Sequence, residues 1–331
     1  MTCVGRRVAL MECFRQAMRR LSLRGRIIAT DVTDTSPGYH TADQGILVPG
    51  TDSPEYVGAL LSAVRRHRVG LLVPVPDQDL LALARHREEF EELGCTVMIG
   101  SEEIVSICQD KARTNALVRK AGLAAIQSCT LEEFRRDPFY PCFIKPIHGS
   151  AGIGTAIIGT AGQLEAHIGT FGDRMLIQEY VPGQEFTIDV YRSRDGRVRC
   201  VVPRQRLIVR SGEVEKGITI NDKRLIDATL KLSSHLGDLW GVYCCQCRRM
   251  DSGGSPRFFE INPRFGGGAP LSMAAGADLP LYLLQEITGR RITARVGRFK
   301  DRLLMLRYDQ AVFVPAGRLD SLPGYRTPQF R

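Results

Sequence analysis

The chain has 331 residues, of which 44% are hydrophobic and 24% are charged, and its formal net charge is +9. This length exceeds one ordinary hydrophobic core, so two or three domains are expected. No apolar run reaches the roughly 18 residues that cross a bilayer, and the N-terminal residues lack the apolar core of a secretory signal. Ten cysteines without framework spacing indicate reduced thiols and a cytoplasmic protein.

Two features of the composition suggest other functions. Cys244, Cys245 and Cys247 are close enough in sequence to suggest zinc, but structural zinc sites pair two such clusters or add histidines at set spacing. The positive charge suggests nucleic acid, but the arginines are spread along the chain without interleaved aromatic residues. We therefore interpret the cysteines as residues on alternate faces of a strand. We interpret the positive charge as that of a protein that binds a polyanionic nucleotide.

The first hundred residues alternate predicted strands and helices. Continuous apolar runs predict buried parallel strands at 26–32, 70–75 and 95–99. Between the first two runs, Ser53 and Pro54 are expected to open a helix, and Gly94 is expected to end the helix before the third run. Residues 1–100 therefore predict an α/β domain with a Rossmann-like open parallel sheet.

The turn Val4-Gly5-Arg6-Arg7 leads into the first helix. It is a weak signal for a phosphate cradle, because a dinucleotide fingerprint needs three glycines after a full strand. Only residues 1–4 can supply that strand. We therefore interpret the segment as a turn between an abbreviated first strand and its helix.

A glycine-rich loop follows a short strand in the middle of the chain. The strand, 142–146, contains Lys145 and runs into His148-Gly149-Ser150-Ala151-Gly152-Ile153-Gly154-Thr155. The glycines let backbone N–H groups approach phosphate oxygens, although the loop lacks the ending of a P-loop, and such a loop taken alone is more often a flexible turn. An ammonium at the end of a buried strand is costly unless an anion meets it, which favours a phosphate-binding role for Lys145.

Capping signals mark several other elements. The helical pattern over 101–122 is expected to be divided by Asp110, which caps the helix that begins at Lys111. Taken alone, Lys111 is an ordinary surface residue of a helix. Thr160 with Gln163 predicts a capping box for the helix after the glycine-rich loop.

The segment 178–185, Gln-Glu-Tyr-Val-Pro-Gly-Gln-Glu, predicts a strand, a tight turn and a second strand. Such a backbone can offer a donor and an acceptor to a purine edge, while a carboxylate takes ribose hydroxyls. An ordinary Pro-Gly hairpin is the plainer alternative. A further hairpin is predicted across Asp195 and Gly196.

The most informative motif is Glu260-Ile261-Asn262-Pro263-Arg264. On an extended strand, residues two apart share a face, so Glu260, Asn262 and Arg264 are expected to point the same way. Carboxylate and amide oxygens are hard ligands suited to Mg²⁺, which bridges substrate phosphates. Arginine offers planar donors to a phosphate or carboxylate. The motif therefore predicts a phosphoryl-transfer site.

The ordered set of motifs resembles the ATP-grasp superfamily. It comprises Asp110-Lys111, Ile144-Lys145-Pro146 with its loop, the segment 178–187, Gln246 and the Glu260 motif. The resemblance is closest to single-unit proteins similar to one half of the carbamoyl phosphate synthase large chain, and it spans about residues 3–313. It implies that domain 1–100 is followed by a two-lobed α+β ATP-grasp fold, with a small lobe and linker at 101–180, a large C-terminal lobe at 181–314 and a tail at 315–331.

The resemblance also implies a role for each matching position. The resemblance makes Lys111 and Lys145 the lysines that bind the phosphates, and it makes a lid over the phosphates of His148, Gly149, Ser150, Gly152 and Gly154. The linker whose backbone meets adenine is Glu179, Tyr180 and Val181, and the carboxylate that binds the ribose is Glu185. The ligands of two Mg²⁺ ions, with Mn²⁺ as a substitute, are Gln246, Glu260 and Asn262. The catalytic residues are Arg264, which steadies the acyl phosphate and its tetrahedral adduct, and Lys145.

The implied reaction joins a small-molecule carboxylate to an amine, with amino acids as candidate substrates. ATP phosphorylates the carboxylate, the amine attacks the acyl phosphate, and an amide, ADP and phosphate are released. Arg204 or Arg206 is expected to contact the carboxylate or the γ-phosphate, unless their segment is a solvated hairpin. The alternatives are an enzyme that releases an acyl or carbamoyl phosphate and a nucleotide-binding regulatory protein without turnover. A homodimer is compatible with the sequence, whereas membrane and nucleic-acid partners are not expected.

Overall fold

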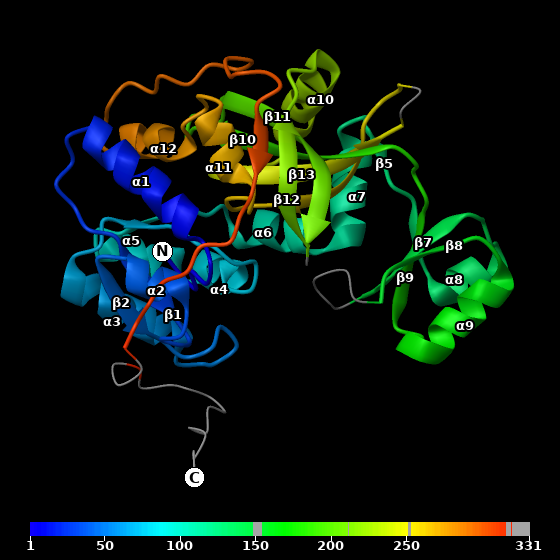
Figure 1. Ribbon diagram of the computed structural model, residues 1–331, viewed down its shortest axis with the longest axis horizontal. Coiled ribbons are helices and arrows are strands. Elements are labelled where there is room, and N and C mark those ends of the chain that lie inside the picture. Colours follow the sequence, from blue (N-terminus) through cyan, green and yellow to red (C-terminus); the bar gives the residue numbers. More distant parts are fainter. Residues whose placement is uncertain (148–153, 211, 251–252, 316–318, 320–331) are drawn as a thin grey trace, which may run out of the picture.

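The computed structural model describes residues 1–147, 154–210, 212–250, 253–315 and 319 (Figure 1). The predicted lid positions His148, Gly149, Ser150 and Gly152 lie outside these residues, as does most of the tail at 315–331. The mixed α/β class is confirmed, and a parallel N-terminal sheet is followed by two antiparallel-rich sheets. Among the described residues, no helix combines the length and apolar character needed to cross a bilayer.

The N-terminal domain is built on short parallel strands. They are β1 (Ile28–Asp31), β2 (Gln44–Leu47), β3 (Leu71–Leu72) and β4 (Thr96–Val97). Residues 1–4 lie between β1 and β3, because Thr30 N donates to Met1 O at 3.0 Å and Thr2 N donates to Val73 O at 3.2 Å. The spatial order is therefore β2, β1, residues 1–4, β3, β4, so the abbreviated first strand occupies the centre of the sheet. The helices of this domain are α1 (Val8–Arg20), α2 (Pro37–Thr41), α3 (Tyr56–His67), α4 (Leu80–Arg85) and α5 (Arg87–Glu92).

The predicted helix start at Ser53 and Pro54 is wrong. The helix α3 begins at Tyr56, and its N-cap residue Glu55 makes no side-chain cap hydrogen bond. Ser53 instead belongs to a preceding turn, in which Tyr56 N donates to Ser53 O at 3.1 Å and the Ser53 hydroxyl bonds the Glu55 carboxylate. By contrast, Gly94 follows α5 with a φ of +76°, as expected of a residue that ends a helix.

Asp110 separates two helices, as predicted. The helix α6 (Glu102–Gln109) ends before it, and α7 (Lys111–Lys120) begins after it. The Asp110 carboxylate accepts hydrogen bonds from Ala112 N at 2.8 Å and Arg113 N at 3.0 Å. These bonds satisfy two otherwise free donors of the first turn and fix the position of Lys111.

The small lobe stands apart from the rest of the molecule in Figure 1. Its sheet has the order β6-β9-β7-β8, and its elements are β6 (Ser128–Thr130), α8 (Leu131–Arg136), β7 (Cys142–Pro146), β8 (Ala156–Ile158), α9 (Ala161–Phe171) and β9 (Met175–Glu179). Thr160 caps α9 by accepting from Gln163 N at 3.3 Å, but the Gln163 side chain accepts from Gly159 N at 2.7 Å. Only the first half of the predicted capping box is therefore present.

The large lobe is a seven-stranded sheet with the order β15-β12-β11-β10-β13-β14-β5. Its strands are β5 (Ala124–Ala125), β10 (Gln184–Arg192), β11 (Val198–Arg210), β12 (Glu213–Thr219), β13 (Gly241–Arg249), β14 (Arg257–Asn262) and β15 (Leu304–Leu306). Its helices are α10 (Lys223–Ser233), α11 (Ala269–Ala274) and α12 (Leu279–Ile287). Residues 102–125, expected in the small lobe, associate with this sheet: β5 pairs with β14, and Val118 of α7 is buried with Phe258 of β14.

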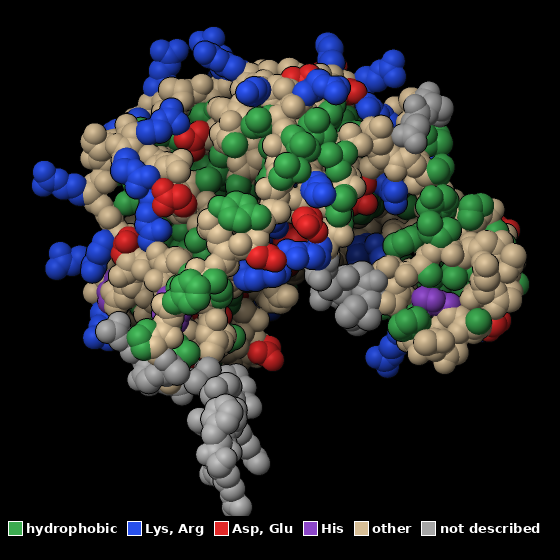
Figure 2. Space-filling model, in the orientation of Figure 1, with side chains coloured by type: hydrophobic (Ala, Val, Ile, Leu, Met, Phe, Trp, Pro, Cys, Tyr) green, Lys and Arg blue, Asp and Glu red, His purple; other side chains and the backbone are tan. Residues whose placement is uncertain are grey.

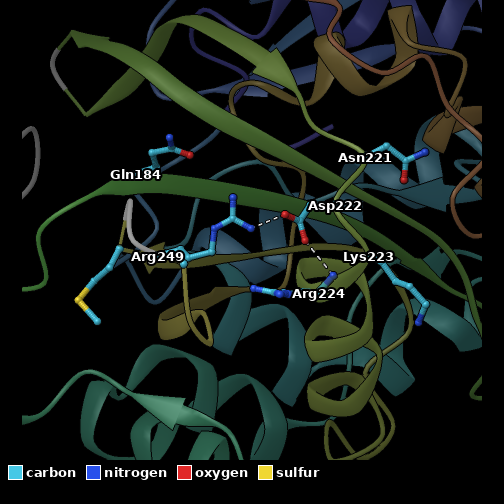
Figure 3. A pocket seen from close by; sticks show the side chains of 8 residues that line it. Gln184, Asn221, Asp222, Lys223, Arg224 and Arg249 are labelled. Atoms are coloured by element: carbon cyan, nitrogen blue, oxygen red, sulfur yellow. Dashed lines mark hydrogen bonds and ion pairs between the residues drawn. The ribbon is translucent and has the colours of Figure 1, made fainter.

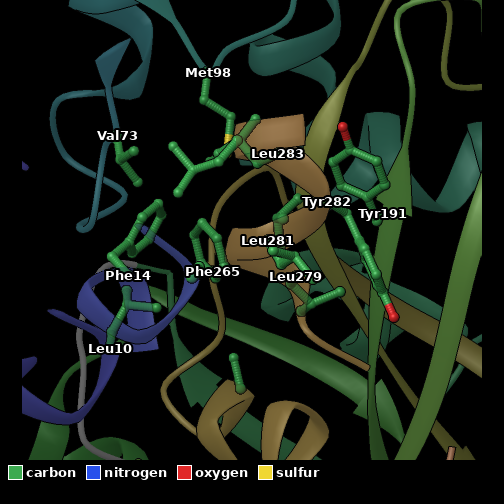
Figure 4. Packing of buried hydrophobic residues seen from close by; sticks show 14 of the residues in the cluster. Leu10, Phe14, Val73, Met98, Tyr191, Phe265, Leu279, Leu281, Tyr282 and Leu283 are labelled. Atoms are coloured by element: carbon green, nitrogen blue, oxygen red, sulfur yellow. The ribbon is translucent and has the colours of Figure 1, made fainter. Parts of the chain in front are cut away.

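A shared hydrophobic core joins the N-terminal domain to the large lobe (Figure 4). The ring of Phe14 on α1 meets the ring of Phe265 edge-on, with centroids 5.5 Å apart. Met98 of the N-terminal domain and Leu283 of α12 belong to the same cluster. Because Phe265 directly follows Arg264, this packing fixes the predicted catalytic loop against the N-terminal domain.

Candidate functional site

The predicted metal ligands lie on one face of two neighbouring strands. Strands β13 and β14 are antiparallel, and their register places Gln246 opposite Glu260 and Cys244 opposite Asn262. Residues opposite each other in an antiparallel pair project to the same side, so the three ligand candidates share a face. Two amide oxygens and one carboxylate form a hard-oxygen donor set, which fits Mg²⁺.

Three charged side chains from three other elements, one of them the ligand candidate Glu260, act on Lys145. Burial lowers the pKa of Lys145 to about 8, and the charge of Lys111 adds to this effect, whereas Glu260 and Glu185 oppose it. Lys145 comes from β7 and Lys111 from α7, whereas the two acids come from β14 and β10. The fold thus brings both predicted phosphate-binding lysines near a predicted metal ligand and the predicted ribose carboxylate.

Arg206 lies between the ribose and metal positions. Its Nη1 is 3.2 Å from Glu185 Oε1 and 3.1 Å from Gln246 Oε1, and its Nη2 donates to Gly212 O at 2.8 Å. Its Nε is buried and has no partner within the described part of the chain. A guanidinium with a spare N–H at this point could donate to an anion, and the contact expected of Arg206 stays a prediction.

Arg204 has a different environment. Its side chain is 1% exposed, and its Nε and Nη2 lie 2.7 and 2.8 Å from the two oxygens of Asp189. Asp189 also accepts from Ser272 Oγ at 2.6 Å, so both charges are paired and hydrogen-bonded inside the lobe. These contacts favour a structural role for Arg204 over contact with a substrate.

Arg264 pairs with a carboxylate of the protein itself, and its contact with a substrate stays a prediction. Its Nε donates to Asp77 Oδ1 at 2.8 Å, its Nη2 bonds the second oxygen, and Nη1 donates to Phe265 O at 3.0 Å. Burial alone would lower the pKa of Arg264, but the charge of Asp77 raises it above its usual value. Asp77 was missed in the sequence, where its only signal is its position just after the run 70–75.

The predicted adenine linker connects β9 of the small lobe to β10 of the large lobe. Glu179 N donates to Gln127 O at 2.9 Å, and the Glu179 carboxylate accepts from Gln127 N at 3.2 Å and pairs with Arg257. Tyr180 is half-buried, and Val181 is buried. The Glu179 side chain is therefore committed to the protein, and Glu179 can offer only its backbone to a base.

Two surface features can be compared with this site: the hollow beside the small lobe and an open pocket. Figure 2 shows basic and acidic side chains gathered beside the hollow that separates the small lobe from the rest of the molecule. An open pocket of about 500 Å³ lies elsewhere (Figure 3), and the side chains around it are Gln184, Asn221, Asp222, Lys223, Arg224, Arg249 and Met250, with Gly253. None of these is a predicted site residue, so this pocket does not coincide with the proposed nucleotide site.

The three cysteines of the 244–247 run are buried. Cys245 and Cys247 pack in the core between the sheet and its helices, whereas Cys244 is opposite Asn262 on the other face. Burial raises the pKa of the Cys244 thiol to about 12, so it is protonated at neutral pH. Within the described ranges, no three His, Cys, Asp or Glu side chains gather as a metal site.

Known proteins share both parts of this architecture. Residues 172–309 match the family described as ATP-grasp in the biosynthetic pathway with Ter operon, and residues 1–98 match the PylC-like N-terminal domain. The formate-dependent phosphoribosylglycinamide formyltransferase of Anaeromyxobacter dehalogenans is 28% identical over 54% of this chain and 48% of its own length. A D-alanine–D-alanine ligase of Leptospira biflexa is 32% identical over 30% of this chain and 32% of its own length. The chain thus spans about half or less of these curated relatives.

Solved structures extend the similarity over nearly the whole chain. The biotin carboxylase domain dimer of Hydrogenobacter thermophilus 2-oxoglutarate carboxylase, in complex with MgADP, ADP and bicarbonate, has a TM-score of 0.69 at 18% identity, covering 92% of this chain and 72% of that chain. An ADP complex of N5-carboxyaminoimidazole ribonucleotide synthetase has a TM-score of 0.69 at 16% identity, covering 90% and 78%. The fold is therefore that of ATP-grasp proteins. The family matches agree with this fold, because residues 172–309 match an ATP-grasp family and residues 1–98 match the PylC-like N-terminal domain.

Proposed function

We propose that this protein is an ATP-dependent carboxylate–amine ligase that forms an amide through an acyl phosphate and releases ADP and phosphate. The observation that carries the proposal is the meeting of Lys111 and Lys145 with Glu260 and Glu185 beside the shared face of Gln246 and Asn262. The match of residues 172–309 to an ATP-grasp family supports it, as do relatives named as ligases.

The nucleotide is held by residues of both lobes. Lys111 and Lys145 bind the α- and β-phosphates, Glu185 takes the ribose hydroxyls, and the backbone of 179–181 faces adenine. Gln246, Glu260 and Asn262 would hold two Mg²⁺ ions, for which Mn²⁺ can substitute. These ions would neutralise charge on the phosphates. Arg206, whose buried Nε has no partner within the described residues, contacts the terminal phosphate.

Phosphoryl transfer needs positioned cations more than covalent help from the protein. Lys145 and Arg206 supply positive charge where the terminal phosphoryl group leaves. Arg264 then holds the activated carboxyl group and the oxyanion that forms when the amine attacks. Asp77 must give up Arg264 for this step, because it occupies the donors that the substrate requires.

We further propose that the substrates are small molecules, with amino acids as the first class to test, and that the enzyme is cytoplasmic. A homodimer is the assembly to test first, since one of the structural neighbours is described as a dimer.

Measurement of ADP release with Mg·ATP and pools of acids and amines tests the proposed reaction. Release that depends on both pools is the expected result. Release with acids alone, trapped by hydroxylamine as a hydroxamate, would instead indicate an enzyme that delivers the acyl phosphate. Tight ATP binding without release in any pool would indicate a regulatory protein.

A further inference from the structure

Three arginines from distant parts of the chain meet near Glu213, the first residue of β12. Arg7 Nη2 lies 2.6 Å from Glu213 Oε1, and Arg307 Nη1 lies 3.7 Å from Glu213 Oε2. Burial alone would raise the pKa of Glu213, but the hydrogen bond from Arg7 and the charges of Arg7, Arg307 and Arg264 lower it. The guanidinium of Arg264 is therefore close enough to influence the same carboxylate.

The arginines of this group outnumber their acids. Among the described residues, Arg7, Arg264 and Arg307 form ion pairs with two carboxylates, those of Glu213 and Asp77, whereas Glu260 acts on Arg264 only through its charge. The three arginine side chains are only 25%, 14% and 34% exposed, in that order. A surplus of half-buried positive charge is unfavourable unless an anion compensates it.

The loop after Arg264 is packed directly against this group. A methyl group on Gly267 would overlap the Glu213 carboxylate and the Arg7 guanidinium, and Arg307 donates a hydrogen bond to Gly267 O. The loop can make this close approach because it carries no side chain there. An anion bound by Arg7 and Arg307 would therefore lie beside the loop that presents Arg264.

The order of the N-terminal strands reverses at the same point, between residues 1–4 and β3. Residues 1–4 and β3 are neighbours in the sheet, and the chain leaves them through two loops, one with Arg7 and the other with Asp77. Open α/β sheets bind ligands where the strand order reverses, at the carboxyl ends of the strands. Both loops contact the large lobe here, through Glu213 and Arg264.

We propose that the substrate held by Arg264 carries a second anionic group, a carboxylate or a phosphate, and that Arg7 and Arg307 bind this group. Glu213 occupies the two arginines in the absence of substrate and yields to the substrate anion, as Asp77 yields at Arg264. This inference rests on the proposed function, because it assumes that Arg264 holds the reacting end of the same molecule.

Calorimetry with malonate and with inorganic phosphate, at constant ionic strength, tests the site directly. Arg307→Gln should weaken binding of the preferred anion by about tenfold or more, since it removes a charge-assisted contact. Glu213→Gln should tighten binding, because a competing carboxylate is lost. The exposed Arg291 provides the matched control, Arg291→Gln, which should behave as wild type.

Two further measurements separate this inference from the proposed function. Arg307→Gln should leave Mg·ATP affinity within about twofold of wild type, whereas Glu260→Gln should lose Mg·ATP binding and keep anion binding. The identity of the second anionic group follows from two comparisons of ADP release. Greater release with aspartate than with asparagine would indicate a carboxylate, and greater release with O-phosphoserine than with serine would indicate a phosphate.

Wild-type anion affinity in Arg307→Gln, or weaker binding in Glu213→Gln, would overturn the proposal even if ATP turnover is normal. The Glu213 variant removes only a charge and keeps the side chain's shape, so it remains a test if an arginine variant fails to fold.

Discussion

Lys145 is the residue whose ionisation most directly links the site to pH. Burial lowers its pKa to about 8, so the ammonium is present at neutral pH and lost as the pH rises through that value. A phosphate favours the ammonium, so Mg·ATP affinity should decline above about pH 8. In Lys145→Ala, affinity should be lower by about tenfold at neutral pH and should lose this decline. Titration calorimetry between about pH 7 and 9 would measure the Mg·ATP affinity of both proteins and its decline with pH. An unchanged decline in the variant would show that another group is responsible.

Glu260 is the only carboxylate among the three proposed metal ligands. Glu260→Ala should abolish ATP turnover while the protein stays folded, because the donor set loses its negative charge. An ADP-release assay measures the turnover of the variant, and a circular dichroism spectrum shows whether it is folded. Glu92→Ala, at the exposed end of α5, is the control and should leave turnover and fold intact. Undiminished ADP production in Glu260→Ala would refute the metal assignment.

At the level of elements, Asp110 links a helix cap to the nucleotide site. Asp110→Ala should cost about 1 kcal/mol of unfolding free energy, the usual value of a lost N-cap, and should also weaken Mg·ATP binding because Lys111 is the first residue of α7. Thr130→Ala removes the cap of α8 and is the matched control for stability. Urea unfolding and calorimetry of both variants separate the effects. Equal ATP affinity in the two variants would argue against a positional role for Asp110.

Local signals predicted several elements of this fold. The period of an extended strand placed Glu260 and Asn262 on one face, and the pairing of β14 with β13 confirms that arrangement. The cap at Asp110 was also evident from sequence. At Ser53 the same reasoning failed, because the hydroxyl bonds Glu55 in a turn and leaves α3 without a side-chain cap.

Contacts between distant segments could not be predicted in this way. Asp77 and Arg264 are 187 residues apart in sequence, and Arg206 and Gln246 are 40 apart. Residue type and local period indicate that these side chains seek charged partners, but not which ones. The partners follow from the order of strands and from the packing of the N-terminal domain on the large lobe.

For the whole molecule, the shared core predicts that the N-terminal domain and the large lobe unfold together. Phe14→Ala removes one side of the contact with Phe265 and should lower the free energy of unfolding by about 3–5 kcal/mol, as large-to-small core changes do. Denaturant unfolding followed by tryptophan fluorescence and circular dichroism should give coincident transitions, because Trp240 lies in the shared core. An early transition of the N-terminal domain alone would contradict this picture.

The central claim is that Gln246, Glu260 and Asn262 hold a divalent cation against the terminal phosphates of ATP. The most direct measurement is a crystal structure with Mn²⁺ and a non-hydrolysable ATP analogue, using anomalous scattering to locate the metal. We expect manganese bound by these three side chains, with Lys111 and Lys145 on the phosphates. Manganese and nucleotide bound elsewhere, for example in the pocket beside Arg249, would contradict the claim.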